Sequence, residues 1–336
     1  MPSVTAPNAV VSSVRGLWWT LARLAVGIGL LVYLAESRLI DFRALTKLVT
    51  AWPITLAALA LVFLDIFFMS LRLCWLFEPQ GLRLPLISSL ELNLVSSFFA
   101  TFLPGAAGGD LAKLFYAARE NRGRRAEIVT TIAFDRAVGL FSILLLPLLF
   151  APLFWSFLGP LIRSVRSLQI LLAVTAALAV AMLAALLLCL FSQSWMTRAA
   201  RWVSRFLPGR QLPERVIATV GAYRGHAGIL IAALAASLVS NLTLIAATAL
   251  AILLLAPASL SMKLCLVIPM GDVANSLPLT PGGLGVGEAA FSALFKIAGL
   301  QGGADALLCW RIWRAMVGLV GLALYLRGMR RAVFQP

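Results

Sequence analysis

Long apolar runs, separated by short polar segments, make up most of the sequence. A helix needs about 20 mainly apolar residues to cross the hydrocarbon core of a bilayer. Six runs are long enough: residues 17–35, 53–77, 127–157, 167–191, 226–256 and 304–326. The pattern therefore predicts an all-α polytopic membrane protein with about six full transmembrane helices.

Two further apolar stretches are interrupted by proline and glycine. Residues 96–120 read SSFFATFLPGAAGGDLAKLFYAARE, and residues 276–300 read SLPLTPGGLGVGEAAFSALFKIAGL. A straight helix does not run through such clusters, and broken backbone at membrane depth is tolerated only inside protein or beside a water-filled cavity. We interpret each stretch as a re-entrant hairpin of two short helices, with tips at residues 104–110 and 278–288. An ordinary kinked helix is the alternative.

The outgoing helix of each hairpin is expected to begin at an acid, where the helix dipole favours a negative charge. The acid is Asp110 in the first hairpin and Glu288 in the second. Arg136 follows Asp110 at the same interval at which Arg314 follows Glu288, and both arginines open similar apolar runs, RAVGLFSILLL and RAMVGLVGLAL. The match indicates an internal repeat, with chance similarity between membrane segments as the alternative.

The two copies are expected to form an inverted repeat within a single transmembrane domain of residues 1–336. Repeat A covers about residues 84–157, and repeat B covers about residues 263–327. Three full spans separate the two hairpins, so one would enter from the cytoplasm and the other from outside. Inverted repeats of broken helices are typical of transporters, in which each half can gate one side of a shared site near the midplane.

Composition and charge agree with a membrane protein. Of the 336 residues, 61% are hydrophobic and 12% are charged, whereas soluble proteins carry about 25% charged residues. The formal net charge of +15 comes from Lys and Arg in short loops, as the positive-inside rule expects, and we exclude nucleic acid as a partner. The distribution predicts a multi-pass protein with both termini cytoplasmic, residues 193–225 inside and Arg163 outside.

Polar side chains within the predicted membrane segments are the candidates for function, since a central charge costs about 2.5–3.5 kcal/mol on insertion. Arginine suits a phosphate ligand because its planar fork donates two parallel hydrogen bonds, and helix N-termini add backbone donors. The acids would hold the arginines in an empty site or carry a coupling proton. Alternatively, the acids and arginines only neutralise one another. The candidate substrate-binding residues are Asp65, Glu91, Asn93, Asp110, Asp135, Arg136, Asp272, Asn275, Glu288, Arg311 and Arg314.

Signatures of enzymes are absent from the sequence. There is no G-x-S-x-G, Walker A or H-E-x-x-H pattern. The single histidine and the four cysteines show no metal-ligand spacing. We therefore expect no catalytic residues, no metal and no cofactor. A transferase that uses Asp110, Asp272 and Glu288 stays open as an alternative.

Three segments resemble a known family. They are NLVSSFFATFLPGAAGGDLAKLFYAARE, the following TIAFDRAVGL, and VANSLPLTPGGLGVGEAAF. Together they are similar to the transmembrane region of lysylphosphatidylglycerol synthases, a flippase-like family, over roughly residues 15–330. In the larger members this region moves an aminoacylated phospholipid between leaflets, and a soluble C-terminal domain makes that lipid. The chain contains no such domain, so we do not expect it to aminoacylate lipids.

The resemblance implies a flippase-like lipid transporter that moves an anionic or phosphate-bearing lipid between membrane leaflets. The substrate would be a phospholipid, an isoprenoid-linked lipid or a hopanoid-type lipid, since stand-alone members are linked to several lipid pathways. Expected partners are membrane lipids, anionic lipid headgroups and a lipid-biosynthesis enzyme. Some relatives carry glycosyltransferase labels, so a membrane-embedded transferase acting on a lipid-linked substrate is one alternative. A non-transporting partner subunit of a lipid pathway is the other.

Overall fold

Helices form all of the regular structure that the computed structural model describes. Among those residues there is no β-strand, in agreement with the predicted all-α class. The described residues are 48–102, 108–120, 122–191, 198, 219–276, 286–327 and 334.

Five of the described helices are long and apolar enough to cross a membrane. They are α3 (Trp52–Phe77), α6 (Arg125–Leu153), α8 (Arg166–Phe191), α11 (Ala227–Leu255) and α14 (Gly303–Arg327). Their positions confirm five of the six predicted spans, and the chain is a multi-pass membrane protein. The first predicted span, residues 17–35, lies outside the described residues.

The third span is shorter than its apolar pattern predicts. The pattern continues through residue 157, but α6 ends at Leu153, and a separate short helix, α7, covers Trp155–Ser164. Pro147 and Pro152 stand in the last turns of α6. Because proline has no backbone N–H to donate, this end of the helix loses hydrogen bonds, and the apolar run divides into two helices.

Each interrupted stretch has a described helix on either side of its Pro- and Gly-containing link. The first pair is α4 (Leu86–Phe102) and α5 (Gly108–Glu120), and the second is α12 (Leu264–Asn275) and α13 (Val286–Ile297). Asp110 and Glu288 lie in the first turns of α5 and α13, as predicted. The links between the helices of each pair, residues 103–107 and 277–285, lie outside the described residues, so re-entry stays a prediction.

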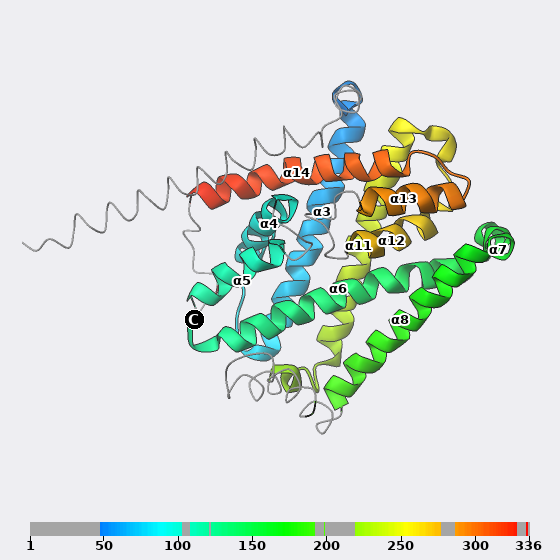
Figure 1. Cartoon of the computed structure of the whole chain (residues 1–336). Coiled ribbons are helices and arrows are strands. Elements are labelled where there is room, and N and C mark those ends of the chain that lie inside the picture. The colour runs from blue at the N-terminus through cyan, green and yellow to red at the C-terminus, as the bar shows by residue number, and fades with distance from the viewer. Residues whose placement is uncertain are drawn as a thin grey trace, which may run out of the picture.

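The helices of the two predicted repeats pack in a reciprocal way. α4 packs against α14, and α12 packs against α6, while α3 and α11, which lie outside the predicted repeats, pack against each other. In Figure 1, α4 and α5 lie towards one end of α14, whereas α12 and α13 lie towards its other end. Each unit thus places the first helix of its broken pair on the last helix of the other unit. The inverted repeat would produce this pattern, although the boundaries of the repeats stay predictions.

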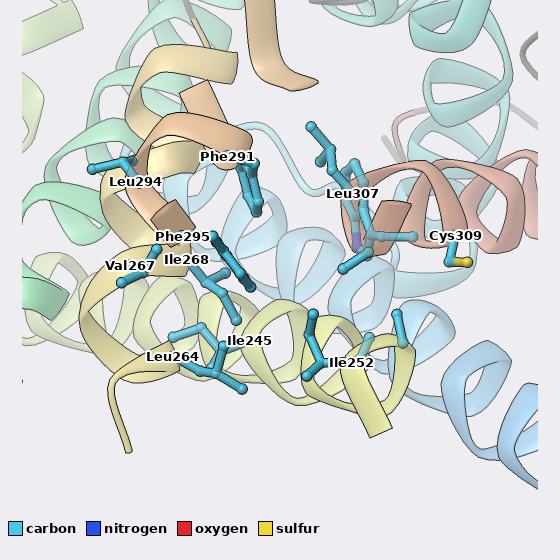
Figure 2. Packing of buried hydrophobic residues seen from close by; sticks show 14 of the residues in the cluster. Ile245, Ile252, Leu264, Val267, Ile268, Phe291, Leu294, Phe295, Leu307 and Cys309 are labelled. Carbon is cyan, nitrogen blue, oxygen red and sulfur yellow. The ribbon is translucent and has the colours of Figure 1, made fainter. Parts of the chain in front are cut away.

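One apolar cluster fills the space between α11, α12, α13 and α14 (Figure 2). Phe291 and Phe295 extend from α13 towards Ile268 of α12 and Leu307 of α14. Gly271 allows this contact, since a Cβ there would lie 2.7 Å from the ring of Phe291. Lipid tails are as apolar as these side chains, so close packing rather than escape from water holds such helices together. The cluster fixes α13 relative to α14.

Candidate functional site

Four polar side chains form a chain of contacts from α12 to α14. Arg311 Nε lies 2.9 Å from Glu288 Oε1, and Arg311 Nη2 donates a hydrogen bond to Asn275 Oδ1 at 2.7 Å. Asn275 in turn donates to Asp272 Oδ1 at 3.0 Å. A Cβ on Gly287 would lie 2.5 Å from Asn275 Oδ1, so the start of α13 can approach this chain only because it carries glycine. The contacts join both helices of the second broken pair to α14.

Arg314, one turn beyond Arg311, contacts a different acid. Its Nη1 lies 3.1 Å from Asp65 Oδ2 of α3, and Ser240 of α11 donates a hydrogen bond to the other oxygen of Asp65. The guanidinium also lies over the ring of Trp310, 5.1 Å from its centroid. The equal spacing of Asp110–Arg136 and Glu288–Arg314 in the sequence is therefore not matched by two equivalent ion pairs. Glu288 pairs with Arg311, and Arg314 pairs with Asp65.

The first broken pair contributes Asp110, and α6 contributes Arg136. Arg136 Nε lies 3.9 Å from Asp110 Oδ2, while Lys113 Nζ lies 3.6 Å from Asp110 Oδ1. The side chain of Lys113 is only 3% exposed, whereas that of Arg136 is 38% exposed. Arg136 thus combines the longest ion-pair distance described here with a guanidinium that stays accessible.

Asp272 lies within electrostatic reach of the three sets of contacts described above, those around Arg311, Arg314 and Arg136. It interacts electrostatically with Arg136 of α6 and with Arg314 and Asp65, and Arg311 interacts electrostatically with both Asp272 and Arg314. We treat these charges as one group because Asp272 is near enough to Arg136, Arg314 and Asp65 for their charges to act on it. We call it the charge cluster. Its members are Asp65, Asp110, Lys113, Arg136, Asp272, Asn275, Glu288, Arg311 and Arg314.

Asp135 lies next to Arg136 in sequence but has a separate set of contacts. Arg72 Nε lies 2.6 Å from Asp135 Oδ1, and Arg72 Nη1 donates a hydrogen bond to Ser237 at 2.8 Å. Both charged side chains are almost fully buried. Successive residues on a helix point about 100° apart, so Arg136 reaches the charge cluster while Asp135 is engaged by Arg72.

The two candidates on α4 have no described contact with the charge cluster. Asn93 donates hydrogen bonds to Ser70 Oγ at 3.1 Å and to Ser89 O at 3.0 Å, which ties α4 to α3. Glu91 is partly exposed, and the described residues give it no ion pair. Their role in binding stays a prediction.

Several polar residues of the site region were not singled out from the sequence. Lys113 follows Asp110 by three residues, a spacing at which side chains on a helix meet, so it could have been found. Ser237, Ser240 and Asn241 form a polar strip within the otherwise apolar α11, and Asn241 donates a hydrogen bond to Ser142 of α6 at 2.7 Å. Such a strip in a membrane helix indicates a protein-facing surface.

The described residues contain no group of three or more His, Cys, Asp or Glu side chains placed to hold a metal ion. The chemistry that the charge cluster offers is instead electrostatic. Its most accessible cation is the guanidinium of Arg136, with a side chain that is 38% exposed, and the starts of α5 and α13 add the positive ends of two helix dipoles. Such an arrangement can bind an anion.

Comparison with known proteins identifies the family. No curated protein and no solved structure matches the chain. The family described as "Lysylphosphatidylglycerol synthase TM region" matches residues 20–328, a stretch that includes all of α3 to α14. The protein therefore belongs to the lysylphosphatidylglycerol synthase transmembrane-region family.

Proposed function

We propose that the protein is a flippase-type transporter that moves a phosphate-bearing lipid between the two leaflets, with the charge cluster as its headgroup site. The observation that carries the proposal is Arg136, an accessible arginine in a membrane helix whose nearest acid is 3.9 Å away. An arginine in this position costs free energy. A lipid phosphate would compensate that cost when it binds.

The geometry of a guanidinium favours phosphate over other anionic groups. Its planar fork donates two parallel hydrogen bonds to phosphate oxygens and keeps its charge when partly buried. Arg311 and Arg314 are less accessible, with side chains 14% and 20% exposed, and each lies about 3 Å from an acid. We therefore assign the first contact with the phosphate to Arg136 and a later contact, deeper in the cluster, to Arg314.

Two helix N-termini strengthen the case for an anion. The first turns of α5 and α13 bring Asp110 and Glu288 to the cluster. The N-terminus of a helix has unpaired backbone N–H groups and the positive end of the helix dipole. A phosphate close to these two helix starts would gain donors that cannot be lost by changing a side chain.

Membership of the transmembrane-region family supports a role in the membrane rather than in solution. We extend the proposal to the bacterial inner membrane, with both termini cytoplasmic and with membrane lipids and a lipid-biosynthesis enzyme as partners. Transport would leave the lipid covalently unchanged. We assign no catalytic residue.

The proposal is tested with the purified chain in liposomes that contain fluorescent lipids in one leaflet. The panel holds phosphatidylglycerol and phosphatidic acid, with a ceramide that lacks phosphate as the negative lipid. We expect the phosphate-bearing lipids to redistribute and the ceramide to stay. Arg136→Lys should slow transport per folded molecule about tenfold, since lysine keeps the charge but loses the fork and one charge-assisted hydrogen bond contributes roughly 1.5–3 kcal/mol.

Arg163→Lys is the matched control. Arg163 is an exposed arginine on α7, outside the charge cluster, and its guanidinium lies 5.2 Å from the centroid of the Trp155 ring. A lysine preserves that cation–π contact, so transport should not change. Normal transport per folded molecule in Arg136→Lys would refute the assignment of Arg136. A covalently altered lipid would favour the transferase alternative.

A further inference from the structure

Asp272 differs from the other acids of the charge cluster. Asp65, Asp110 and Glu288 each lie within 4 Å of a cation, Arg314, Lys113 or Arg311. Asp272 is 7% exposed, and the one described hydrogen bond to its side chain comes from the neutral amide of Asn275. It is the one acid of the cluster that has no ion pair within the described residues.

The elements around Asp272 define the charges that act on it. α12 packs against α6, α11 and α13. α6 contributes Arg136, α13 contributes Glu288, and α11 has no charged residue along its length. Beyond these neighbours, Asp272 interacts electrostatically with Asp65 of α3 and with two arginines of α14, Arg311 and Arg314.

The charges of the whole cluster balance when every group is ionised. The cations are Lys113, Arg136, Arg311 and Arg314, and the acids are Asp65, Asp110, Asp272 and Glu288. A phosphodiester that enters would leave the charge cluster with one excess negative charge, close to an Asp272 that is only 7% exposed. An uncompensated charge away from water is expensive, so the site must take up a cation or neutralise one of its own acids.

Asp272 is the acid that can be neutralised without breaking an ion pair. Protonating Asp65, Asp110 or Glu288 would leave a contacting cation without its partner, which is strongly unfavourable in a buried site. Protonating Asp272 removes a carboxylate whose described hydrogen bond comes from an amide, and a protonated carboxyl still accepts that bond. The bound phosphate would then replace Asp272 as a negative charge that acts on Arg136.

From this arrangement we infer that Asp272 is a proton-binding site, and that each phosphodiester entering the charge cluster brings one proton onto its carboxylate. The inference rests on the proposed function and adds an energy source to it. A proton from solvent binds the Asp272 oxygen as the anion binds, and it leaves when the anion leaves. If the two events occur on opposite sides of the membrane, a proton gradient drives the lipid in the same direction as the proton.

The first experiment measures the linkage without transport. Dihexanoyl phosphatidylglycerol is added to the detergent-purified chain in weak buffer with a pH indicator. We expect uptake of about one proton per bound lipid and an affinity that falls up to tenfold per pH unit once Asp272 is ionised. Asp272→Asn should bind the lipid with little proton uptake and with an affinity that does not depend on pH.

Asp305→Asn is the control, because Asp305 is an exposed acid near the start of α14 outside the cluster. It should keep both the proton uptake and the pH dependence. Lipid binding without proton uptake in the unchanged chain would overturn the inference, as would full uptake in Asp272→Asn. Failure to bind phosphatidylglycerol at every pH would count against the inference and the phosphate site together.

The second experiment is done in liposomes and tests proton coupling separately from lipid transport. A pH gradient is imposed across the membrane, and the redistribution of fluorescent phosphatidylglycerol is followed with a pH-sensitive dye inside. Coupled transport predicts that the gradient biases the lipid distribution and that lipid movement dissipates the gradient. Lipid redistribution that does not depend on the pH gradient would agree with the proposed transporter but would refute proton coupling. No redistribution of any phosphate-bearing lipid would refute the transporter itself.

Discussion

Arg72 and Asp135 show how a buried ion pair differs from a binding site. Arg72 of α3 donates hydrogen bonds from Nε to Asp135 of α6 and from Nη1 to Ser237 of α11, so it joins the three helices. A Cβ on Gly139 would lie 3.0 Å from Arg72 Nη1, so this guanidinium is enclosed by protein as well as paired. These contacts leave little room for a ligand and indicate that the pair stabilises the fold.

Arg72→Ala should therefore reduce stability rather than transport. Removing one partner of a buried ion pair costs about 3–5 kcal/mol, because the other charge stays buried alone. We expect a large loss of folded protein in size-exclusion chromatography of detergent extracts. The folded fraction should transport at a normal rate.

The double substitution Arg72→Met, Asp135→Leu distinguishes the two roles. Apolar replacement of both partners of a buried pair is often neutral or stabilising, so folded yield should recover relative to Arg72→Ala. If the double variant folds well but loses transport, Asp135 belongs to the binding site after all.

Pairs of charges were only partly predictable from the sequence. The interval between Asp110 and Arg136 in the sequence pointed to two residues that do lie close together. This contact was predictable because the two residues belong to neighbouring helices of one predicted repeat. Asp65 and Arg314 are 249 residues apart, and no local pattern connects them. Sequence spacing follows the chain, whereas these pairs depend on how two distant units pack.

At the scale of helices, close contact between α4 and α14 depends on two glycines. A Cβ on Gly321 would lie 2.1 Å from the backbone oxygen of Leu94, and one on Gly318 would lie 3.3 Å from Phe98 Cα. Small residues let membrane helices approach until their backbones touch. The crossing of α4 and α14 holds the first broken pair on the last helix of the second unit.

Gly321→Ala should separate these helices. The added methyl group meets backbone, which cannot rotate away, so we expect a marked fall in the temperature at which the purified protein unfolds. Gly228→Ala is the control, because a Cβ there meets nothing within 4 Å and alanine favours a helix by up to about 1 kcal/mol over glycine. Equal effects of the two substitutions would show that the α4–α14 contact contributes little.

The helices themselves followed from the sequence more closely than their contacts did. Apolar length placed α3, α8, α11 and α14, and the acids expected at two helix starts, Asp110 and Glu288, lie in the first turns of α5 and α13. The end of α6 was misplaced because hydropathy continues past Pro152 into α7. Hydropathy measures what lipid tolerates, whereas backbone hydrogen bonding decides where a helix ends.

At the scale of the whole molecule, the two units pack against each other in a reciprocal way. α4 lies on α14 and α12 lies on α6 (Figure 1). The orientation of the two units relative to the membrane is what separates an inverted repeat from a parallel one.

Labelling of single cysteines tests the orientation. Arg119, Arg163 and Gln301 are exposed and are each replaced by cysteine in a chain whose native cysteines are alanine. A membrane-impermeant reagent added to intact cells should label Arg163→Cys and Gln301→Cys, and it should label Arg119→Cys only after the cells are opened. Labelling of Arg119→Cys and Gln301→Cys from the same face would contradict the inverted repeat.

The long separation of Asp65 from Arg314 has a consequence for biosynthesis. Ribosomes add about 5–20 residues per second, so α14 emerges roughly 10 to 50 seconds after α3, given the 249 residues between the two partners. During that interval the Asp65 carboxyl stands in an apolar helix without its guanidinium, at a cost of about 2.5–3.5 kcal/mol if it lies at the bilayer centre. The nascent α3 should therefore stay with the insertion machinery, or lie displaced towards the membrane surface, and reach its final depth only when α14 arrives.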